Sequence, residues 1–367
     1  MLLLMLTLVA AVAGAEPVTV YVAPNGSDAA SGREPQTPVA TIARAQEIAR
    51  AARQGSTDGY KLVLRGGTYY LPQTVTFGPE DSGSQEVPTQ LVAFGGEQVR
   101  LVAGRDLSQE VWQPWKGRIK QLDLTTVGLG GRVFRQLFCG RERQAMARTP
   151  NFDPSDPHGG KWALTEAAAE AGSKRVFKYA AGDMKPWADL SQAEVFIFHS
   201  YNYYATIVPL VAVDAAGRVA RLGQDTYDVI QGDGAERYFV QGLFEELDAP
   251  GEWHLDRKNS VLSFWPPDGS SESATPIEVP LAEHVVAIDG AKHVLIRGLT
   301  LEVSEGGAVD IHGATACRVV GCKVGHCGVG GRSEAGRHGR TSAAWASSRP
   351  PTVPPSAMTS TTRAAMA

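Results

Sequence analysis

The sequence predicts an all-β chain, namely a parallel β-helix with an N-terminal capping helix and an inserted β-rich domain. Three observations lead to this fold class. Short apolar segments alternate with glycine turns, the segment 106–270 is rich in aromatic residues, and a 23-residue repeat covers residues 288–333. Forty glycines exceed average usage, which suits a chain that turns often.

The first 15 residues, MLLLMLTLVAAVAGA, form an apolar run that ends in Ala13-Gly14-Ala15. Such a run before a small-residue cleavage site is typical of a secretory signal peptide. A membrane anchor needs about 20 apolar residues, and a buried N-terminal strand is the remaining alternative. We therefore expect an exported protein, secreted, periplasmic or held at the cell surface, with no membrane partner after cleavage of residues 1–15.

Composition narrows the function classes. The formal net charge of −4 gives no reason to expect nucleic acid as a partner. Four cysteines are too few for a disulfide framework in a chain of 367 residues. No GxSxG or HExxH motif occurs, and GHCGVGG lacks the GxGxxG spacing of a nucleotide loop. We predict no cofactor and no bound metal.

Residues 16–105 are expected to form the N-terminal cap and the first coils. VTVYVAP (18–24) alternates as a strand does. TIARAQEIARAAR (41–53) repeats apolar residues on one helical face behind Thr41, a suitable N-cap, and predicts a helix. The following strands are short and have no helices between them; they are KLVLRGGTYYL, TVTF, QLVAFGG and VRLVAG.

Residues 106–270 are expected to form the inserted β-rich domain. VFIFHSYNYYATIVPLVAVDAAGRVARL (195–222) predicts a strand, a loop, a strand, a hairpin turn and a strand. Aromatic residues such as Trp253, Tyr203 and Tyr204 suit stacking on sugar rings, and packing in a core is the alternative for each.

Residues 271–331 are expected to form further rungs of the helix. In the repeat, 288–310 matches 311–333, so that Ile288 corresponds to Ile311 and Gly298 to Gly321. IEVPL (277–281) reads as an earlier, imperfect copy. One rung cannot bury its inward side chains alone, whereas stacked rungs bury them as continuous columns.

The segment CRVVGCKVGHC places cysteines at 317, 322 and 327 beside a histidine, which invites a metal-site interpretation. In the repeat, Cys317 and Cys322 match Val294 and Leu299, so both are expected to point into the core as small hydrophobic residues. Cys327 matches Ser304 and is expected at a turn as a free thiol. This register argues against a zinc site.

Residues 332–367 do not continue the pattern. They contain no Ile, Leu, Phe or Tyr, and five arginines against one glutamate. One interpretation is a disordered basic tail, since such a segment buries too little apolar surface to fold. The other is a shift of the coding frame near residue 331, which would truncate a longer β-helix before its catalytic rungs.

The recognisable repeats hold few candidates for chemistry. The candidate catalytic residues are Glu302, Glu305, Asp310 and His312, and His312 occupies the position of Asp289 one rung earlier. Hydrolysis of a glycosidic bond uses two carboxylates, whereas a lyase uses a base and a cation. A solvated surface role is the alternative for each residue.

A second cluster, Asp153, Asp156 and His158, carries carboxylate oxygens of the kind that bind calcium. Rigid Asp-Pro turns explain the same residues without a metal.

Several stretches carry a resemblance to a known family. YVAPNGSDAASGREPQTPVATIARA, LVLRGGTYYL, LFCGRERQAMARTPN and LDAPGEWHLDRKNSVLSFWPP resemble segments of secreted bacterial right-handed parallel β-helix repeat proteins, which have the pectate-lyase-like superfold. Within these, the chain is similar to β-helical glycoside hydrolases of the fucosidase and xylanase type, in which a β-rich domain interrupts the helix.

The resemblance implies an exported carbohydrate-active protein whose partner is a plant or algal cell-wall polysaccharide. The catalytic acids of such relatives are expected on later rungs, so no catalytic residue is carried over and enzymatic activity of this chain stays open. A polysaccharide lyase and a non-catalytic glycan-binding or surface β-helix protein are the alternatives to a glycoside hydrolase.

Overall fold

The computed structural model describes residues 17–53, 55–153, 155–156, 161–231, 236–269, 275–328 and 341–342. The predicted signal peptide, His158 and nearly all of 332–367 lie outside these ranges. Within them the only α-helix is α1 (Ile42–Ala52), accompanied by two short 3-10 helices, η1 (Pro79–Asp81) and η2 (Phe244–Glu246). The prediction of an all-β chain is confirmed.

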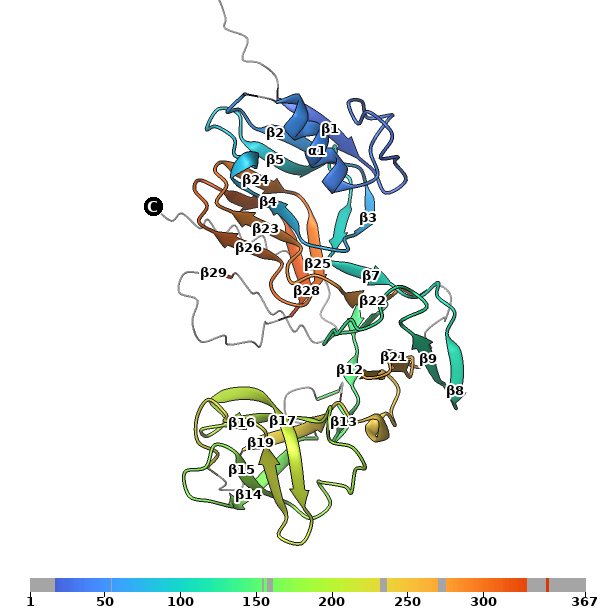
Figure 1. The fold of residues 1–367 in the computed structure, drawn as a ribbon, viewed down its shortest axis with the longest axis vertical. Coiled ribbons are helices and arrows are strands. Elements are labelled where there is room, and N and C mark those ends of the chain that lie inside the picture. Colours follow the sequence, from blue (N-terminus) through green and yellow to red (C-terminus); the bar gives the residue numbers. More distant parts are fainter. Residues whose placement is uncertain are drawn as a thin grey trace, which may run out of the picture.

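Three sheets of parallel strands lie together in the upper part of Figure 1. The first contains β1 (Val18–Val22), β2 (Tyr60–Leu64), β5 (Thr89–Ala93), β24 (Val294–Arg297) and β27 (Arg318–Val320). The second contains β3 (Gly67–Tyr70), β6 (Val99–Val102), β25 (Thr300–Ser304) and β28 (Lys323–Cys327). The third contains β4 (Val75–Phe77), β23 (Val286–Asp289) and β26 (Val309–His312), with β29 (Thr341–Ser342) antiparallel to β26.

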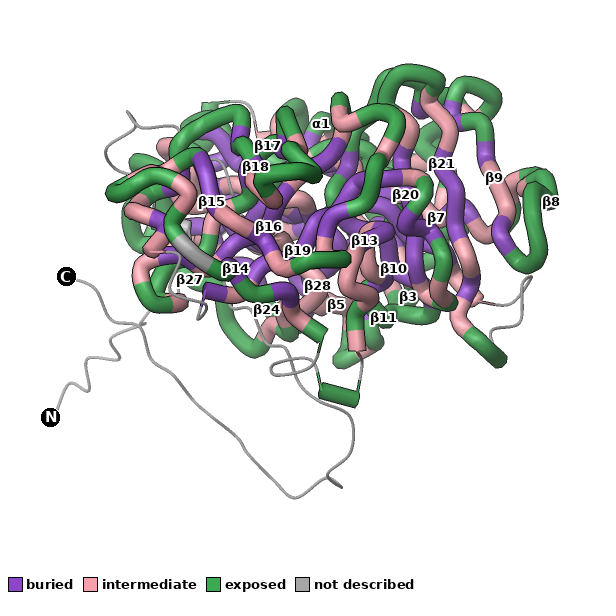
Figure 2. The backbone as a smooth tube through the Cα atoms, turned by 90° about the horizontal axis from the view of Figure 1, so that it is seen from below, coloured by how far each residue is buried: buried purple, intermediate pink, exposed green. Residues whose placement is uncertain are grey.

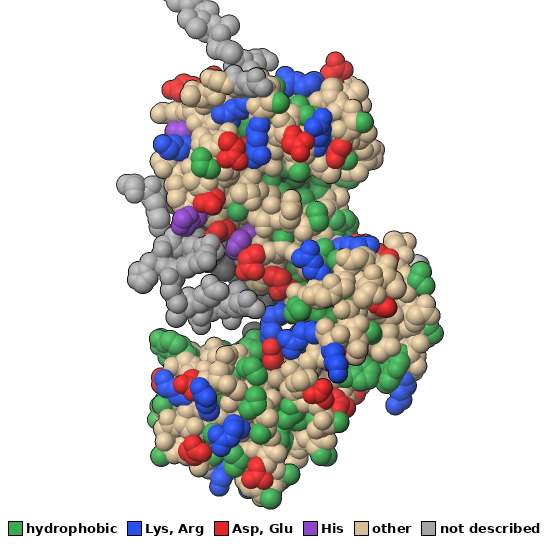
Figure 3. Space-filling view, viewed as in Figure 1, with side chains coloured by type: hydrophobic (Ala, Val, Ile, Leu, Met, Phe, Trp, Pro, Cys, Tyr) green, Lys and Arg blue, Asp and Glu red, His purple; other side chains and the backbone are tan. Residues whose placement is uncertain are grey.

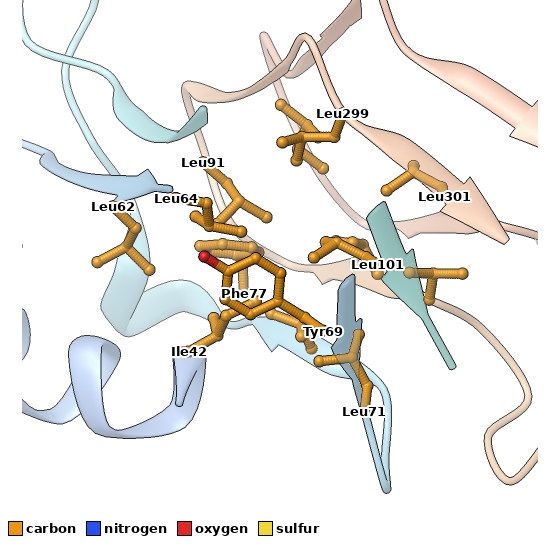
Figure 4. Close-up of a cluster of buried hydrophobic side chains, with 14 of the residues drawn as sticks. Ile42, Leu62, Leu64, Tyr69, Leu71, Phe77, Leu91, Leu101, Leu299 and Leu301 are labelled. Atoms are coloured by element: carbon orange, nitrogen blue, oxygen red, sulfur yellow. The ribbon is translucent and has the colours of Figure 1, made fainter. Parts of the chain in front are cut away.

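Successive passes of the chain through these sheets form what we call the parallel stack. The first complete pass is β2, β3 and β4, and a later pass in the same direction, the third, is β24, β25 and β26. Apolar residues of neighbouring strands lie opposite one another, as Leu62, Leu91 and Ile296 do. These columns are fully buried and meet in one core, where the leucines and aromatic rings of Figure 4 point toward one another. Burial of each such side chain contributes about 1.5–3 kcal/mol.

The helix α1 packs its apolar face into the same core. Ile42, Ala45 and Ala49 are buried against it. The side chain of Thr41 accepts a hydrogen bond from the backbone N–H of Arg44, so the predicted N-cap is confirmed. The helix ends at Ala52, where the backbone N–H of Arg53 donates to the carbonyl of Ala49.

A long excursion interrupts the second pass of the stack. That pass uses β5 and β6, but its third strand is β23, which pairs with β4 on one side and β26 on the other. The chain between Val102 and Val286 therefore leaves the stack and returns to it. The strands at its two ends, β7 (Gly104–Asp106) and β22 (Ile277–Pro280), pair antiparallel with each other.

The excursion forms three further sheets, drawn in the middle and lower parts of Figure 1. The smallest joins β7 and β22 to β10 (Phe138–Cys139) and β11 (Glu142–Arg143). The next contains β8 (Gln113–Lys116), β9 (Ile119–Asp123), β21 (Val261–Phe264), β20 (Glu252–Asp256) and β12 (Ala145–Met146).

The third sheet of the excursion closes on itself. Its strands are β13 (Arg148–Thr149), β19 (Arg237–Gln241), β14 (Ala163–Ala168), β15 (Val176–Tyr179), β18 (Val219–Leu222), β17 (Tyr204–Asp214) and β16 (Glu194–His199). Because β16 pairs with both β17 and β19, six antiparallel strands form a barrel. Its interior is a separate apolar cluster that includes Phe177, Ile197 and Tyr238. Figure 2 shows that buried residues follow the strands while the connecting turns are exposed.

One interpretation of the sequence is wrong, that of IEVPL, and the alternative of core packing is confirmed for Trp253. IEVPL is not a rung, because β22 pairs antiparallel with β7 and β10 instead of joining a parallel sheet. Its alternation resembles that of a rung because a strand covered on both faces shows similar apolar residues. Trp253 is fully buried between Phe134 and its other neighbours, so its role is core packing.

Cys317 and Cys322 behave as the repeat predicts, whereas Cys327, predicted at a turn, lies at the end of strand β28. Cys317, Cys322 and Cys327 are partly buried, pack against the core of the stack and carry free thiols. Cys327 lies opposite Ser304. Burial raises the pKa of the Cys317 and Cys322 thiols, which disfavours the thiolate form that binds metals.

Candidate functional site

The candidate site begins on the outward face of the second parallel sheet. Side chains alternate across a strand, so Leu101 and Leu301 point into the core while Arg100 and Glu302 point outward. The excursion covers part of this face, because Val102 and Val303 of the stack pack against Phe138. Figure 3 shows acidic, basic and histidine side chains gathered where the stack meets the rest of the chain.

Arg100 connects two carboxylates that come from distant parts of the sequence. Its two terminal nitrogens donate to Glu278 Oε1 and Oε2 at 2.6 and 2.7 Å, and its Nε donates to Glu302 Oε2 at 2.5 Å. The Tyr70 hydroxyl also donates to Glu278 Oε1, at 2.9 Å. Glu278 and Glu302 are both buried, so each carboxylate depends on these partners for its charge.

Two further groups contact Glu302 from its other side. The exposed Arg141 pairs with Glu302 Oε1, and His326 Nδ1 lies 3.7 Å from the same oxygen, too far for a hydrogen bond. The His326 ring packs edge-on against Phe138 with a centroid separation of 5.2 Å. Burial alone would raise the pKa of Glu302, but His326, Arg100 and Arg141 outweigh burial and lower it to about 2.

Glu305 lies just beyond the end of β25 in a different environment. Its Oε1 accepts a hydrogen bond from the backbone N–H of Arg135 at 2.8 Å. The guanidinium of Arg135 is directed to Glu194, with contacts of 2.9 and 2.6 Å. Burial raises the pKa of Glu305, and the contacts with Arg135 offset only part of that effect. Glu302 and Glu305 are thus close in the sequence, with Val303 and Ser304 between them, but their pKa values are shifted in opposite directions.

Asp310 and His312 lie elsewhere, on β26 of the third parallel sheet. Asp310 is partly buried opposite Ala287. His312 is exposed, and its Nδ1 lies 3.3 Å from Oδ1 of Asp289, which is 23 residues earlier and also exposed. The structure therefore brings Glu302 and Glu305 to the end of one strand and places Asp310 and His312 on another sheet.

Sequence reasoning did not find Arg100, Glu278, Arg141 and His326. A signal existed for Arg100, since VRLV places one charged residue within an otherwise apolar strand. Glu278 shows the same pattern in IEVP. No periodicity connects these residues, because Arg100 and Glu278 are 178 positions apart.

Two hollows lie near these elements. The first, beside Arg135, Glu194 and Arg257, has a volume of about 30 Å³, room for roughly one water molecule. The second is an open groove of about 630 Å³ beside α1 and β4, lined by residues that include Gln46, Arg50 and Glu80. Glu302 lines neither of these hollows and only 5% of its side chain is accessible, so a substrate would reach this carboxylate only after a neighbouring side chain moves.

The described ranges contain neither a cluster of metal-binding side chains nor a membrane-spanning helix. No group of three or more His, Cys, Asp or Glu residues is placed there to hold a metal ion. Asp153 Oδ1 instead accepts hydrogen bonds from the backbone and hydroxyl of Ser155, as a turn residue does. None of the helices in this part of the chain has the length and apolar character needed to cross a membrane.

Comparison with known proteins gives a structural likeness but no family. No family model matches the sequence, and no curated protein matches it. A solved structure described as a glycoside hydrolase aligns with a TM-score of 0.63 at 20% identity, covering 78% of this chain and 51% of that one. The chain thus spans about half the length of this relative.

Two other solved structures align less well. The complex of XylC with xylose gives a TM-score of 0.30 at 12% identity, covering 80% of this chain and 41% of XylC. The Gp54 tailspike of Acinetobacter baumannii bacteriophage AP22, in complex with a capsular saccharide, gives 0.18 at 9% identity, covering 77% and 43%. The likeness with a TM-score of 0.63 shows a shared fold for most of this chain.

Proposed function

We propose that this chain is an exported carbohydrate-active protein of the glycoside hydrolase type, with Glu302 and Glu305 as its pair of carboxylates. The observation that carries the proposal is the opposite shift of their pKa values, lowered to about 2 for Glu302 and raised for Glu305. Glycosidic bond hydrolysis needs one carboxyl group that keeps its proton and one that stays ionised.

In this proposal the parallel stack is a right-handed parallel β-helix, and the excursion between Val102 and Val286 is a β-rich insertion. The parallel pairing of three sheets and the fold shared with a glycoside hydrolase support this view. A glycan chain would lie across the outward face of the second parallel sheet, where the insertion forms one wall.

The roles follow from the surroundings of each carboxylate. Glu305, whose burial favours the protonated form, serves as the general acid. Glu302 is kept ionised and serves as base or nucleophile. Arg141 is the exposed partner of Glu302, with 54% of its side chain accessible, whereas Arg100 is held by Glu278 as well. Release of Arg141 would therefore free Glu302 Oε1 for water or for an anomeric carbon.

A second candidate function is glycan binding without catalysis. The observation that favours it is the saturation of Glu278 and Glu302 by Arg100, an arrangement that stabilises a buried interface. In that case the ion pairs hold the insertion against the stack, and neither carboxylate reacts.

The decisive experiment is hydrolysis of a panel of soluble cell-wall polysaccharides by the purified chain, measured by release of reducing ends. Replacing the acid with E305Q is expected to lower kcat by roughly 10²–10⁴. E302Q is expected to abolish turnover, with circular dichroism verifying the fold. The matched controls D310N and H312Q, on another sheet, are expected to retain activity.

Other outcomes decide between the alternatives. Products that absorb in the unsaturated-uronate band would identify a lyase. Binding of a glycan without cleavage of any polymer in the panel would favour the non-catalytic function. Full activity of both E302Q and E305Q would exclude this pair of carboxylates.

A further inference from the structure

Four exposed tyrosines gather at one end of the barrel and form what we call the tyrosine cluster. Tyr201, Tyr203 and Tyr204 lie at the connection between β16 and β17, and Tyr227 follows β18. Their exposed fractions are 70%, 78%, 39% and 71%. Packing in a core, the alternative weighed for Tyr203 and Tyr204 from the sequence, is therefore excluded for Tyr203.

Three of the four rings, those of Tyr203, Tyr204 and Tyr227, form a continuous surface. Tyr204 is central, with ring centroids 4.8 Å from Tyr203 and 4.9 Å from Tyr227. Its inner neighbour is the buried imidazole of His199, whose plane is inclined to the Tyr204 ring by 25° at 6.1 Å. The cluster therefore rests on the barrel core and is not a set of independent surface side chains.

The backbone beneath these rings is held in an unusual conformation. Ser200, Tyr201 and Asn202 have φ values of 53°, 58° and 60°, in the left-handed region that non-glycine residues seldom adopt. Three consecutive residues of this kind persist only where the surrounding structure imposes them, and such segments concentrate at ligand-binding sites.

Hydrogen bonds from three segments impose this conformation. The backbone N–H of Ser200 donates to the Val229 carbonyl at 3.2 Å, and Asn202 Oδ1 accepts the backbone N–H of Arg237 at 2.9 Å. Lys174 Nζ donates to the Tyr227 carbonyl at 3.1 Å, which fixes the segment after β18 that carries Tyr227. The rings are thus positioned before any partner arrives, which lowers the entropy cost of binding.

We propose that the tyrosine cluster is a binding site for a neutral glycan chain, separate from the Glu302 site. Tyrosine offers a large, rigid ring for the apolar face of a pyranose and a hydroxyl for its polar edge, at low entropy cost. Contiguous exposed aromatic surface of this kind marks an interaction site. This binding does not depend on hydrolysis and goes beyond the proposed function.

The charges beside the cluster favour a neutral chain over an acidic one. Arg175 pairs with Asp225, and the ammonium of Lys174 is directed to the Tyr227 carbonyl. Asp228 Oδ1 accepts the backbone N–H of Val229. These cations are engaged and are balanced by carboxylates, so a polyuronate gains no net attraction here.

Affinity electrophoresis of the full chain through gels that contain a neutral xylan, a neutral β-glucan or polygalacturonate tests the proposal. Retardation is expected in at least one neutral gel and not with polygalacturonate. Y203A and Y227A are each expected to weaken binding at least roughly fivefold, the effect of losing a contributing aromatic contact. Y203F keeps the ring and is expected to stay within about threefold of the parent.

W115A is the matched control, because Trp115 is an exposed aromatic residue outside the cluster, packed on Phe244. It is expected to bind as the parent chain does. Equal retardation of Y203A and the parent chain would overturn the proposal, as would preferential binding of polygalacturonate.

Sedimentation velocity tests whether a second copy of the chain, instead of a glycan, occupies the tyrosine cluster. A dimer that Y203A converts to a monomer would assign the cluster to self-association and overturn the proposal. Retardation that is sensitive to Y203A, in a chain that hydrolyses nothing, would contradict the proposed hydrolase function and still support the glycan site. Hydrolysis that is lost in E305Q, with retardation unchanged by Y203A, would support the proposed hydrolase function and overturn the glycan site.

Discussion

The parallel stack and the antiparallel barrel both bury an apolar core, but they complete it in different ways. In the stack, each strand pairs with the strand of the next pass, so Ile288 lies opposite Ile311, and the strand β27 leaves Val319 39% exposed. In the barrel, β16 pairs with β17 and β19, and Ile197 is fully buried. The stack is additive, coil upon coil, whereas the barrel is closed and has no free edge among these six strands.

This difference predicts that truncating a core side chain costs different amounts of stability in different coils of the stack. Around the barrel, the cost should be similar from strand to strand. It also makes the contact between the two regions important, because the additive structure gains rigidity from whatever covers its outward face. Arg100 provides the strongest such contact, since it belongs to the stack and pairs with Glu278 of the excursion.

The largest effect is expected for Arg100→Met. Its loss leaves Glu278 and Glu302 buried without their shared cation, which destabilises a protein by about 3–5 kcal/mol. Guanidinium denaturation measures the loss. Arg118→Ala is the control, because its partner Asp268 is exposed and such pairs are worth less than about 1 kcal/mol. A loss as small as that of the control would mean that the stack and the excursion are held together without this pair.

The next effect separates the two cores. Leu91→Ala in the stack and Ile197→Ala in the barrel are each expected to cost about 2–5 kcal/mol, because both side chains are fully buried. In the described part of the chain every tryptophan lies between Trp112 and Trp265, outside the stack. Tryptophan fluorescence should therefore follow Ile197→Ala, while far-UV circular dichroism should respond to both substitutions.

Val319→Ala tests the additive character of the stack. Since Val319 is partly exposed, its truncation is expected to cost less than about 1 kcal/mol, although it continues the same column as Leu91. A cost equal to that of Leu91→Ala would contradict the expectation that the last described coil contributes least to the stability of the stack.

A pH-dependent effect is expected in the sheet next to the barrel. Burial raises the pKa of Glu252 from 4.5 to about 7, and its Oε1 has no hydrogen-bond partner in the described structure. The folded chain therefore keeps a proton that the unfolded chain loses, so stability falls by about 3 kcal/mol as pH rises from 4.5 to 7. Urea denaturation across this range measures the slope, and E252Q should remove it.

The pH dependence of stability that Glu302 contributes on β25 of the stack has the opposite sign. The pKa of Glu302 is about 2, so its stabilising contribution is complete above the unfolded value near 4.5 and is lost as pH falls toward 2. E302Q should therefore flatten the acid side of the stability profile and leave the fall in stability between pH 4.5 and 7 unchanged. An identical profile for E252Q and E302Q would refute both assignments.

A small effect is also expected at the N-terminal end of the stack. Thr41→Ala removes the side-chain acceptor for the backbone N–H of Arg44 and is expected to cost about 1 kcal/mol. Thermal unfolding of T41A and T41S measures it, and the serine should restore most of the loss because it keeps the hydroxyl.

The stack could be predicted in detail because its contacts repeat. Ile288 and Ile311 pair as the repeat indicates, and α1 begins after the cap that the sequence predicts at Thr41. Closure of the barrel could not be predicted, because the pairing of β16 with β19 follows no period. IEVPL was misassigned for the related reason that a doubly covered antiparallel strand resembles a rung.

The candidate site, like the fold, could be predicted only in part. The repeat drew attention to Glu302, Glu305 and Asp310 as carboxylates at its outward or turn positions, and to His312 because it matches Asp289 one rung earlier. It could not show that Glu302 shares Arg100 with a carboxylate 178 positions away from that arginine, nor that Asp310 faces a different sheet. Both facts arise from the path of the excursion, which local sequence does not encode.

The pairing of β4 with β23 has a consequence for the order of events during synthesis. The ribosome delivers β1 to β6 early, but the strand that completes their second coil begins only at Val286, after the whole excursion. Bringing such distant ends together is entropically costly and slow. Until the barrel and its neighbouring sheets have folded and shortened that distance, the nascent stack exposes unpaired strands. A newly made chain thus passes through a period in which it is most vulnerable to aggregation.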